Sequence, residues 1–213
     1  MIQIYYAYTD ILNNINLDQF IAQLSFKTKS RYFALKRKED KDLLILSAIL
    51  LSKLLAENVP NDLKLSELKY NAAGRPFFED SRFDFNISHT DNCAAVAYSQ
   101  IRSIGIDIEK IKDVDFSDFE NIFSEKEWNL IYSSNNKNKT FHNYWTLLES
   151  ALKADGRGLS LISSNKIALY NDQVFIDGTV WFSKHIFFDS SISCCISSNR
   201  KIEDINIHKI EII

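Results

Sequence analysis

The most constraining stretch of the chain is Ser103–Glu109, which reads Ser-Ile-Gly-Ile-Asp-Ile-Glu. Successive side chains of a β-strand point to opposite faces, so the three isoleucines share one face and Asp107 and Glu109 share the other. Two carboxylates about 7 Å apart on one strand face are unfavourable for folding unless a positive group lies near them. Two interpretations stay open at this point: a half-buried edge strand with two solvated acids, or two ligands of a hard divalent cation.

Length and composition limit the classes of protein that the chain fits. Its 213 residues suit one large domain or two small ones, and 46% hydrophobic residues are normal for a globular core. A net charge of −3 gives no indication of a nucleic-acid partner. We expect no membrane partner, because no apolar run approaches the roughly 18 residues that span a bilayer. The N-terminal residues lack the basic start and cleavage site of a signal peptide and are expected to form a strand.

The three cysteines do not have the spacing of a metal site. They are Cys93, Cys194 and Cys195, and the last two are adjacent, so on a strand they point to opposite faces. We expect all three to be small, buried and unpaired in a reducing compartment. This favours a cytoplasmic protein.

Hydrophobic periodicity predicts strands and helices that alternate twice along the chain, as in two α+β halves that join near residues 103–112. The capping-box pair of Ser124 and Glu127 marks the start of one helix, and Asn16 is a candidate cap for another. Helices are expected at 17–24, 39–57, 114–122, from 124 onward and at 140–155. Strands are expected at 2–8, at three places within 83–109, and near 166–170, 173–176, 179–188, 191–197 and 205–212.

A basic cluster lies within an acidic protein. The segment Ser25–Leu35 carries Lys27, Lys29 and Arg31, and Lys36–Lys38 adds three more cations. One interpretation is a solvated helix face. The other is a site for phosphate or for an acidic partner.

A second acidic element lies in the helix predicted at 140–155. Glu149 and Lys153 lie one turn apart and so share a face. Such a pair stabilises an exposed helix by about 0.3–0.5 kcal/mol, and this is the simplest interpretation. The alternative makes Glu149 a third carboxylate that meets Asp107 and Glu109, with Lys153 facing a bound phosphate.

Four motifs in order resemble those of the 4′-phosphopantetheinyl transferases. They are Gly74-Arg-Pro, Phe85-Asn-Ile-Ser-His-Thr, Gly105-Ile-Asp-Ile-Glu and the run Trp145–Gly158, which reads Trp-Thr-Leu-Leu-Glu-Ser-Ala-Leu-Lys-Ala-Asp-Gly-Arg-Gly. The similarity is to the long, Sfp-type group, in which one chain holds two pseudo-symmetric halves, and it covers roughly residues 25–165.

The resemblance implies a fold and an activity. It implies an α+β fold with the active site at the interface of residues 1–104, which contact the coenzyme A phosphates and adenine, and residues 105–213, which carry the metal site and catalytic helix. Such enzymes transfer the 4′-phosphopantetheine arm of coenzyme A to a serine of an apo acyl or peptidyl carrier protein. They require Mg²⁺ and release adenosine 3′,5′-bisphosphate. The resemblance also implies a monomer, because one chain holds both halves of the site.

Matching motif positions carries the roles of the family's residues onto this chain. Asp107, Glu109 and Glu149 would hold Mg²⁺, and Glu149 would also be the general base, acting directly or through water. Lys153 would neutralise charge on the pyrophosphate. The remaining residues would bind coenzyme A: Arg31 the 3′-phosphate, Gly74, Arg75 and Pro76 the adenine end, and Ser88 and His89 the phosphates.

Two residues depart from the pattern of the family. Leu148 stands where the family usually has a lysine, and Lys153 or Arg157 would have to supply the missing charge. Asp42 stands where an Arg-Thr pair is common, and it would repel a phosphate. These departures leave open a non-catalytic relative that binds coenzyme A or a carrier protein as a regulatory module. An unrelated Mg²⁺ phosphohydrolase is supported by the carboxylates alone. We expect the carrier to dock on exposed basic or apolar residues, which the sequence does not locate.

Overall fold

The structure of the protein is a computed structural model that describes residues 1–59, 63–79, 81–100, 103–158, 161 and 167–211. It has the mixed α+β fold expected from the sequence. The chain divides into two compact units, of which the first comprises Met1–Ile104 with Glu203–Ile213 and the second Gly105–Ile202. Among the described residues, no helix has both the length and the apolar character needed to cross a bilayer.

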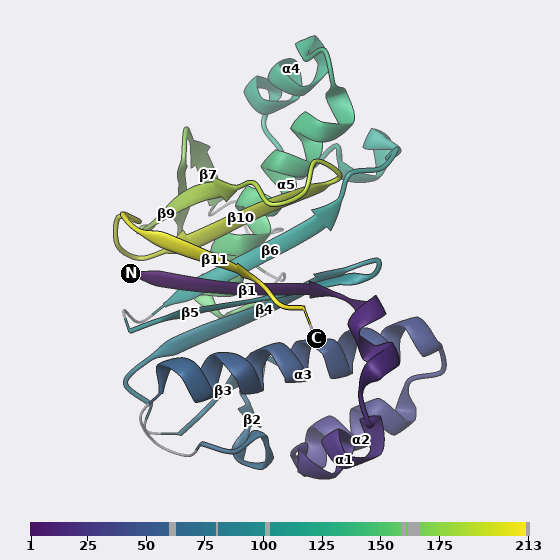
Figure 1. Ribbon diagram of the computed structural model, residues 1–213. Coiled ribbons are helices and arrows are strands. Elements are labelled where there is room, and N and C mark those ends of the chain that lie inside the picture. The colour runs from purple at the N-terminus through teal and green to yellow at the C-terminus, as the bar shows by residue number, and fades with distance from the viewer. Residues whose placement is uncertain (60–62, 80, 101–102, 159–160, 162–166, 212–213) are drawn as a thin grey trace. The chain divides into compact units, whose positions relative to one another are not determined.

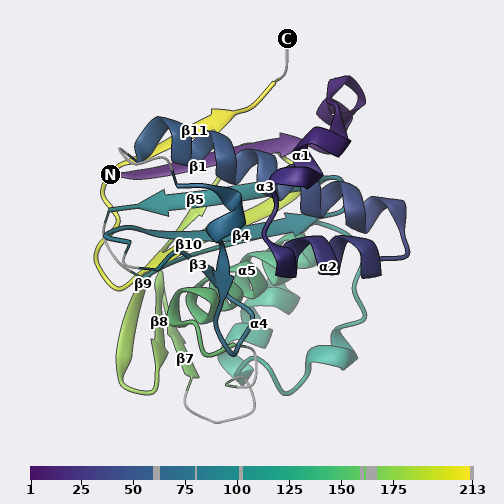
Figure 2. The ribbon, with the colours of Figure 1, turned by 90° about the horizontal axis from the view of Figure 1, so that it is seen from below.

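The first unit is a four-stranded sheet in the order β11-β1-β5-β4, with the long helix α3 packed along it (Figures 1 and 2). The sheet strands are β1 (Ile2–Tyr8), β4 (Asp84–Thr90), β5 (Cys93–Ser99) and β11 (Ile205–Lys209). The helices are α1 (Leu17–Gln23), α2 (Phe26–Ala34) and α3 (Lys38–Asn58). A small second sheet pairs β2 (Lys69–Tyr70) with β3 (Pro76–Phe77).

Helix α3 forms because its leucines recur at helical spacing, as predicted for residues 39–57. Leu46, Leu50 and Leu54 are fully buried in the core of the first unit. Burying one such side chain contributes about 1.5–3 kcal/mol. The predicted cap of α1 is also present, because the side chain of Asn16 accepts a hydrogen bond from the Gln19 backbone N–H.

The C-terminal strand β11 belongs to the first unit. It lies parallel to β1, in a register that runs from Ile2 opposite Ile205 to Tyr6 opposite Lys209. The division expected from the sequence placed residues 105–213 in the second half, and within that range the strand β11 extends the sheet of the first unit. Residue 212, expected at the end of this strand, lies outside the described residues, as does residue 166 at the start of β7.

The second unit is a five-stranded sheet in the order β6-β10-β9-β8-β7, with α5 packed on it. Its helices are α4 (Glu125–Ser133) and α5 (Lys137–Asp155). Its strands are β6 (Ile104–Lys110), β7 (Ile167–Tyr170), β8 (Gln173–Ile176), β9 (Thr179–Ile186) and β10 (Ile192–Ser198). The predicted capping box of Ser124 and Glu127 starts α4, and Gly156 ends α5 in the left-handed conformation.

One predicted helix of the second unit is wrong. Residues 114–122 contain only a short 3₁₀ helix, Phe116–Phe119, rather than an α-helix. Aromatic packing explains the difference, because the rings of Phe116 and Phe119 lie 5.3 and 4.9 Å from that of Phe141. These tertiary contacts override a weak local helix pattern.

The three cysteines Cys93, Cys194 and Cys195 are free and buried, as predicted. Cys194 and Cys195 lie next to each other in β10.

In the second unit, hydroxyl groups join α5 to the sheet. The Oγ of Ser150 lies 2.7 Å from that of Ser197, and the Oγ1 of Thr146 lies 3.0 Å from the Oγ of Ser193. Paired in this way, the buried hydroxyls avoid the cost of unsatisfied polar groups.

Gly105 lets the backbone of β6 approach the backbone of α5. A Cβ atom at this position would lie 2.1 Å from the carbonyl oxygen of Ser150 and 2.4 Å from the backbone nitrogen of Ala154. Both of these atoms belong to backbone and cannot swing aside. The glycine therefore sets the distance between the strand that carries Asp107 and the helix that carries Glu149.

We predict that Gly105→Ala lowers the free energy of unfolding by about 3 kcal/mol or more, because the methyl group forces strand and helix apart. Urea unfolding measures the change. The matched control is Gly178→Asn in the β8–β9 turn. There φ is +83°, nothing lies within 4 Å, and asparagine tolerates the left-handed conformation. An unchanged midpoint in Gly105→Ala would contradict the close approach.

Candidate active site

The carboxylate of Asp107 is buried against a lysine. On β6 the residue is 1% exposed, and its Oδ1 accepts a hydrogen bond from the Nζ of Lys153 at 2.5 Å. The same Nζ lies 3.8 Å from the Oε2 of Glu149, one turn earlier on α5. The interpretation of β6 as an edge strand with two solvated acids is therefore wrong for Asp107. The isoleucines Ile104, Ile106 and Ile108 are fully buried, so β6 is packed on both faces up to Ile108.

Electrostatic crowding changes the titration of this cluster. Burial, together with the charges of Asp107 and Glu109, raises the pKa of Glu149 to about 7 against the opposing charge of Lys153. Burial on its own lowers the pKa of Lys153, but Asp107 and Glu149 outweigh it and raise that pKa above its ordinary value. Three carboxylates thus share one ammonium group, and the cluster holds an excess of negative charge.

The donor set of this cluster fits a hard divalent cation in its chemistry. Carboxylate oxygens are the ligands that Mg²⁺ takes in proteins, usually one or two together with water and substrate phosphates. Within the described part of the chain, however, no three His, Cys, Asp or Glu side chains are arranged closely enough to hold a metal ion. Lys153 explains this arrangement, because its ammonium group bridges Asp107 and Glu149.

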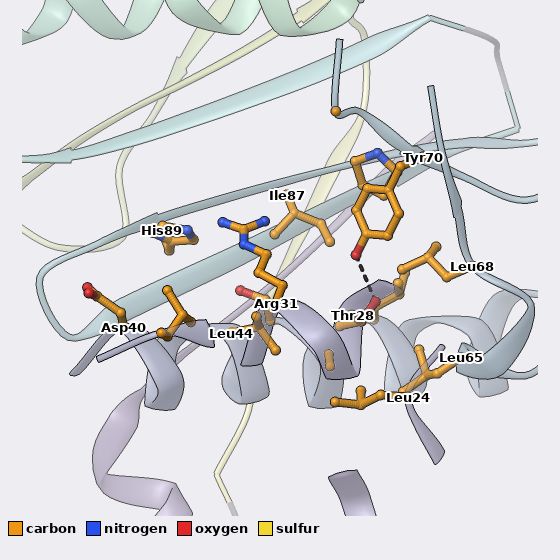
Figure 3. A pocket seen from close by; sticks show the side chains of 16 residues that line it. Leu24, Thr28, Arg31, Asp40, Leu44, Leu65, Leu68, Tyr70, Ile87 and His89 are labelled. Atoms are coloured by element: carbon orange, nitrogen blue, oxygen red, sulfur yellow. Dashed lines mark hydrogen bonds between the residues drawn. The ribbon is translucent and has the colours of Figure 1, made fainter. Parts of the chain in front are cut away.

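A cavity of about 290 Å³ lies in the first unit, lined by α2, α3 and β4 and by the segment from 65 to 76. Figure 3 shows the guanidinium group of Arg31 pointing toward the strand that carries Ile87 and His89. The hydroxyl groups of Thr28 and Tyr70 lie 2.9 Å apart, to the right of Arg31 in this view. The apolar lining consists of Leu24, Leu35, Leu44, Ala48, Leu51, Leu65, Leu68, Pro76 and Ile87. An apolar cavity with a few convergent polar groups is typical of a small-molecule site.

Besides Lys153 on α5, six residues are expected to bind coenzyme A, and four of them line this cavity: Arg31, Gly74, Pro76 and His89. Ser88 does not, because neighbouring residues of β4 point to opposite faces, and Ser88 is 4% exposed on the other side. Gly74 adopts φ +83° in a turn closed by hydrogen bonds to Asn71.

Arg75 lies outside the lining and binds protein groups instead. Its Nη2 donates to the Oδ2 of Asp84 at 2.6 Å and to the carbonyl oxygen of Ile104 at 2.8 Å. The same Asp84 oxygen accepts the backbone N–H of Ile104 at 2.8 Å. Both side chains are largely buried, so this ion pair holds the turn at 71–75 against β4.

The two departures from the family pattern have local explanations. Leu148 is 2% exposed and belongs to the apolar core of the second unit. Asp42 pairs with Lys38 at 2.5 Å, which compensates its charge. Arg157, a candidate for replacing the missing cation, binds Asp155 and Asp177.

Sequence reasoning missed Thr28, Asp40 and Tyr70, which also line the cavity. Thr28 carried a signal, because it precedes Arg31 by three residues and so shares its helix face. Asp40 lies in the first turn of α3 and brings a negative charge to the lining. Tyr70 directly precedes the Asn71–Arg75 turn, but no local pattern predicts the direction of its ring.

Comparison with known proteins identifies the family. The model of the 4′-phosphopantetheinyl transferase superfamily matches residues 103–195, which include Asp107, Glu109, Glu149 and Lys153. The 4′-phosphopantetheinyl transferase gsp of Aneurinibacillus migulanus is 31% identical over 179 residues, covering 79% of this chain and 73% of the relative. The chain belongs to this superfamily.

A further relative places the chain in the long, Sfp-type group of phosphopantetheinyl transferases. The 4′-phosphopantetheinyl transferase Sfp of Bacillus subtilis (strain 168) is 28% identical over 183 residues, which are 82% of this chain and 80% of the relative. The 4′-phosphopantetheinyl transferase HetI of Nostoc is 36% identical over 110 residues, or 47% of this chain and 46% of the relative. The phosphopantetheinyl transferases are transferase enzymes, and the chain shares the α+β fold of this family.

We predict that Glu149→Gln stabilises the metal-free protein at about pH 8 and leaves it nearly unchanged at about pH 4. With a folded pKa of about 7 against an ordinary value of 4.5, the folded chain holds a proton that the unfolded chain releases. Stability therefore falls as the pH rises through this interval, by up to about 3 kcal/mol. Glutamine mimics the protonated acid and removes this loss.

Urea unfolding in a chelating buffer at the two pH values measures this difference. The exposed residue Glu125 on α4 supplies the matched control, Glu125→Gln. The same offset at both pH values in Glu149→Gln would contradict the raised pKa.

Proposed function

We propose that this transferase moves the 4′-phosphopantetheine arm of coenzyme A onto a serine of an apo acyl or peptidyl carrier protein. The observation that carries the proposal is the pairing of Lys153 with Asp107 and Glu149, on a strand and a helix brought together by Gly105. These are the motif positions at which the family carries its chemistry. The free cysteines of the chain suit the reducing cytoplasm, and we propose that the protein acts there as a monomer.

The carboxylates Asp107, Glu109 and Glu149 would hold Mg²⁺. When bound, this ion would supply positive charge to the pyrophosphate of coenzyme A. Lys153 is a long side chain with an ammonium group, and once displaced from Asp107 it would neutralise phosphate charge. The carboxylates would then pair with Mg²⁺ and Lys153 with a phosphate, in place of the ion pair between Lys153 and Asp107. The local charge would stay balanced.

In the proposed step, the serine Oγ of the carrier forms a bond to the β-phosphorus of coenzyme A. The bond from that phosphorus to the bridging oxygen breaks, and adenosine 3′,5′-bisphosphate leaves. A serine hydroxyl is a weak nucleophile and needs a base. Glu149 would take the hydroxyl proton, directly or through water. The protein contributes chiefly position and charge stabilisation, as is usual in phosphoryl transfer.

The cavity of the first unit would bind the nucleotide end of coenzyme A. Arg31 and His89 would contact the 3′-phosphate and neighbouring phosphates, and Gly74 and Pro76 would pack near the adenine. Apolar side chains of α3 suit a planar base. We propose no direct contact for Ser88 or Arg75, because neither lines the cavity. The pairing of Asp42 with Lys38 offsets the charge of one departure from the family pattern, and Lys153 would supply the positive charge that is missing at Leu148.

The transfer test incubates the purified chain with coenzyme A, Mg²⁺ and an apo acyl carrier protein. Mass spectrometry should detect the mass of one phosphopantetheine on the carrier. We predict that Glu149→Gln lowers the rate by on the order of 10²–10³, because a positioned base and metal ligand is lost. Glu125→Gln, an exposed change of the same chemistry, should keep the full rate. Full activity of Glu149→Gln would refute the role of Glu149, and no transfer to any carrier would refute the function.

Two arginines should respond differently to alanine. Arg31→Ala removes a charged contact to coenzyme A, so its KM for coenzyme A should rise roughly 10–100-fold with unfolding unchanged.

Arg75→Ala leaves Asp84 without its guanidinium partner and should lower stability by about 2 kcal/mol or more. Arg82→Ala, at an exposed position, is the control for both. Steady-state kinetics and urea unfolding separate the two effects, and a raised KM in the control would undermine the assignment.

A further inference from the structure

The second unit contains a cavity that the proposed chemistry does not use. Its volume is about 140 Å³, and it lies where the first turns of α5 meet the end of β9 and the start of β10. The polar part of its lining comes from Lys139, Asn143, His185, Ser190 and Ser193. The described lining includes none of the residues proposed to hold Mg²⁺ or coenzyme A. The cavity is therefore a candidate for a second ligand.

Two residues of α5 present hydrogen-bond donors to this cavity. Lys139 and Asn143 lie one turn apart and so share a face of the helix. The Oδ1 of Asn143 accepts a hydrogen bond from the Oγ of Ser193 at 2.9 Å, so the NH₂ group is the end of this amide that a ligand can use. Lys139 is exposed, and within the described part of the chain no ion pair engages its ammonium group.

His185 brings an acceptor to the same cavity. One nitrogen of its ring donates a hydrogen bond to the backbone carbonyl of Cys194 on the neighbouring strand. The charged groups around the ring are Lys139 of α5 and Asp172 of the turn between β7 and β8. Burial lowers the pKa of His185 below its ordinary value, so the ring is neutral at about pH 7.5. A neutral imidazole has one N–H group, and its second nitrogen is therefore an acceptor.

The charge of the lining suits an anion. Lys139 is positive, and no Asp or Glu occurs among the described lining residues. The acidic residue of the connection between β9 and β10, Asp189, already accepts hydrogen bonds from the backbone N–H and the Oγ of Ser191, both at 2.7 Å. That Oγ also accepts a hydrogen bond from the Nζ of Lys110. A ligand here would meet one ammonium group, an amide NH₂ group and one acceptor nitrogen.

We propose that this cavity binds hydrogen phosphate, the inorganic ion HPO₄²⁻. Lys139 and Asn143 would donate to its charged oxygens. The hydroxyl group that the ion keeps at neutral pH would donate to the second ring nitrogen of His185. Sulfate has a similar shape and charge but has no hydroxyl group. It would therefore leave that nitrogen without a donor and bind more weakly.

A phosphate ester is another source of the same group. The observations favour the free ion, because an ester phosphate loses its last proton at a pH of about 6 and then has no hydroxyl group for His185. The ring of Phe187, which is 72% exposed at this cavity, is nevertheless a surface on which an apolar ester could rest. Phenyl phosphate therefore serves as one arm of the test.

The experiment measures binding to the full chain by isothermal titration calorimetry, at about pH 7.5, with a chelator and without coenzyme A. Inorganic phosphate should bind with a dissociation constant of about 1 mM or lower. Sulfate and phenyl phosphate should bind about tenfold more weakly. In NMR spectra, the side-chain amide of Asn143 should shift as phosphate is added and should reach its plateau over the same concentrations.

Variants test the two kinds of contact separately. Lys139→Gln should weaken phosphate binding about tenfold or more. The matched control is Lys137→Gln, an exposed change on the same helix and outside the lining, which should bind like the unchanged chain. His185→Phe should lower the affinity for phosphate to that for sulfate and leave sulfate binding unchanged. Urea unfolding without phosphate checks that each variant folds.

The outcomes that would overturn the proposal are distinct, and none of these measurements depends on transfer activity. No saturable binding of phosphate up to about 20 mM would refute the site. Equal affinities for phosphate and sulfate would refute recognition through the hydroxyl group. Tighter binding of phenyl phosphate, lost in Lys139→Gln, would replace the free ion by an ester. Phosphate binding that is lost in Arg31→Ala and kept in Lys139→Gln would assign the ion to the cavity of the first unit instead.

Discussion

The close approach of β6 and α5 at Gly105 is the constraint on which the second unit depends. Strand and helix meet backbone to backbone there, so their side chains have little freedom to shift. The hydroxyl pairs Ser150–Ser197 and Thr146–Ser193 fix the same helix against β10, the neighbour of β6 in the same sheet. A rigid frame of this kind is what keeps Asp107 and Glu149 near one another despite their mutual repulsion.

Lys153 resolves that repulsion in the absence of any other cation. Its ammonium group pairs with Asp107 at close range and with Glu149 at longer range. This pairing reduces the repulsion enough for the unit to fold, but the cluster keeps a net negative charge. A site of this kind is poised to accept positive charge. The cavity of the first unit has the opposite charge, because Arg31 and His89 line it and Asp40 is the one acidic residue among the described lining residues.

The sequence predicted most of the fold because its patterns are local. The leucine stripe of α3, the capping box at Ser124 and the alternation along β4 and β5 all depend on near neighbours. It failed where distant contacts decide, as in the 3₁₀ helix at Phe116–Phe119. For the candidate site, the sequence indicates which residues carry polar or charged side chains, but not the directions in which those side chains point. Arg75 and Ser88 carry the right chemistry, and only tertiary structure reveals that one binds Asp84 and the other faces away from the cavity.

The place of β11 beside β1 has a consequence for how the chain is made. The second unit is inserted in the first, and β1 gains its parallel neighbour only after about a hundred further residues have followed Ile104. At the ordinary pace of translation this leaves one edge of β1 without its partner for roughly 5–20 s. The second unit is continuous in sequence and can fold before the first is complete. A nascent chain at this stage presents an open strand edge, the feature by which unfinished proteins pair with one another.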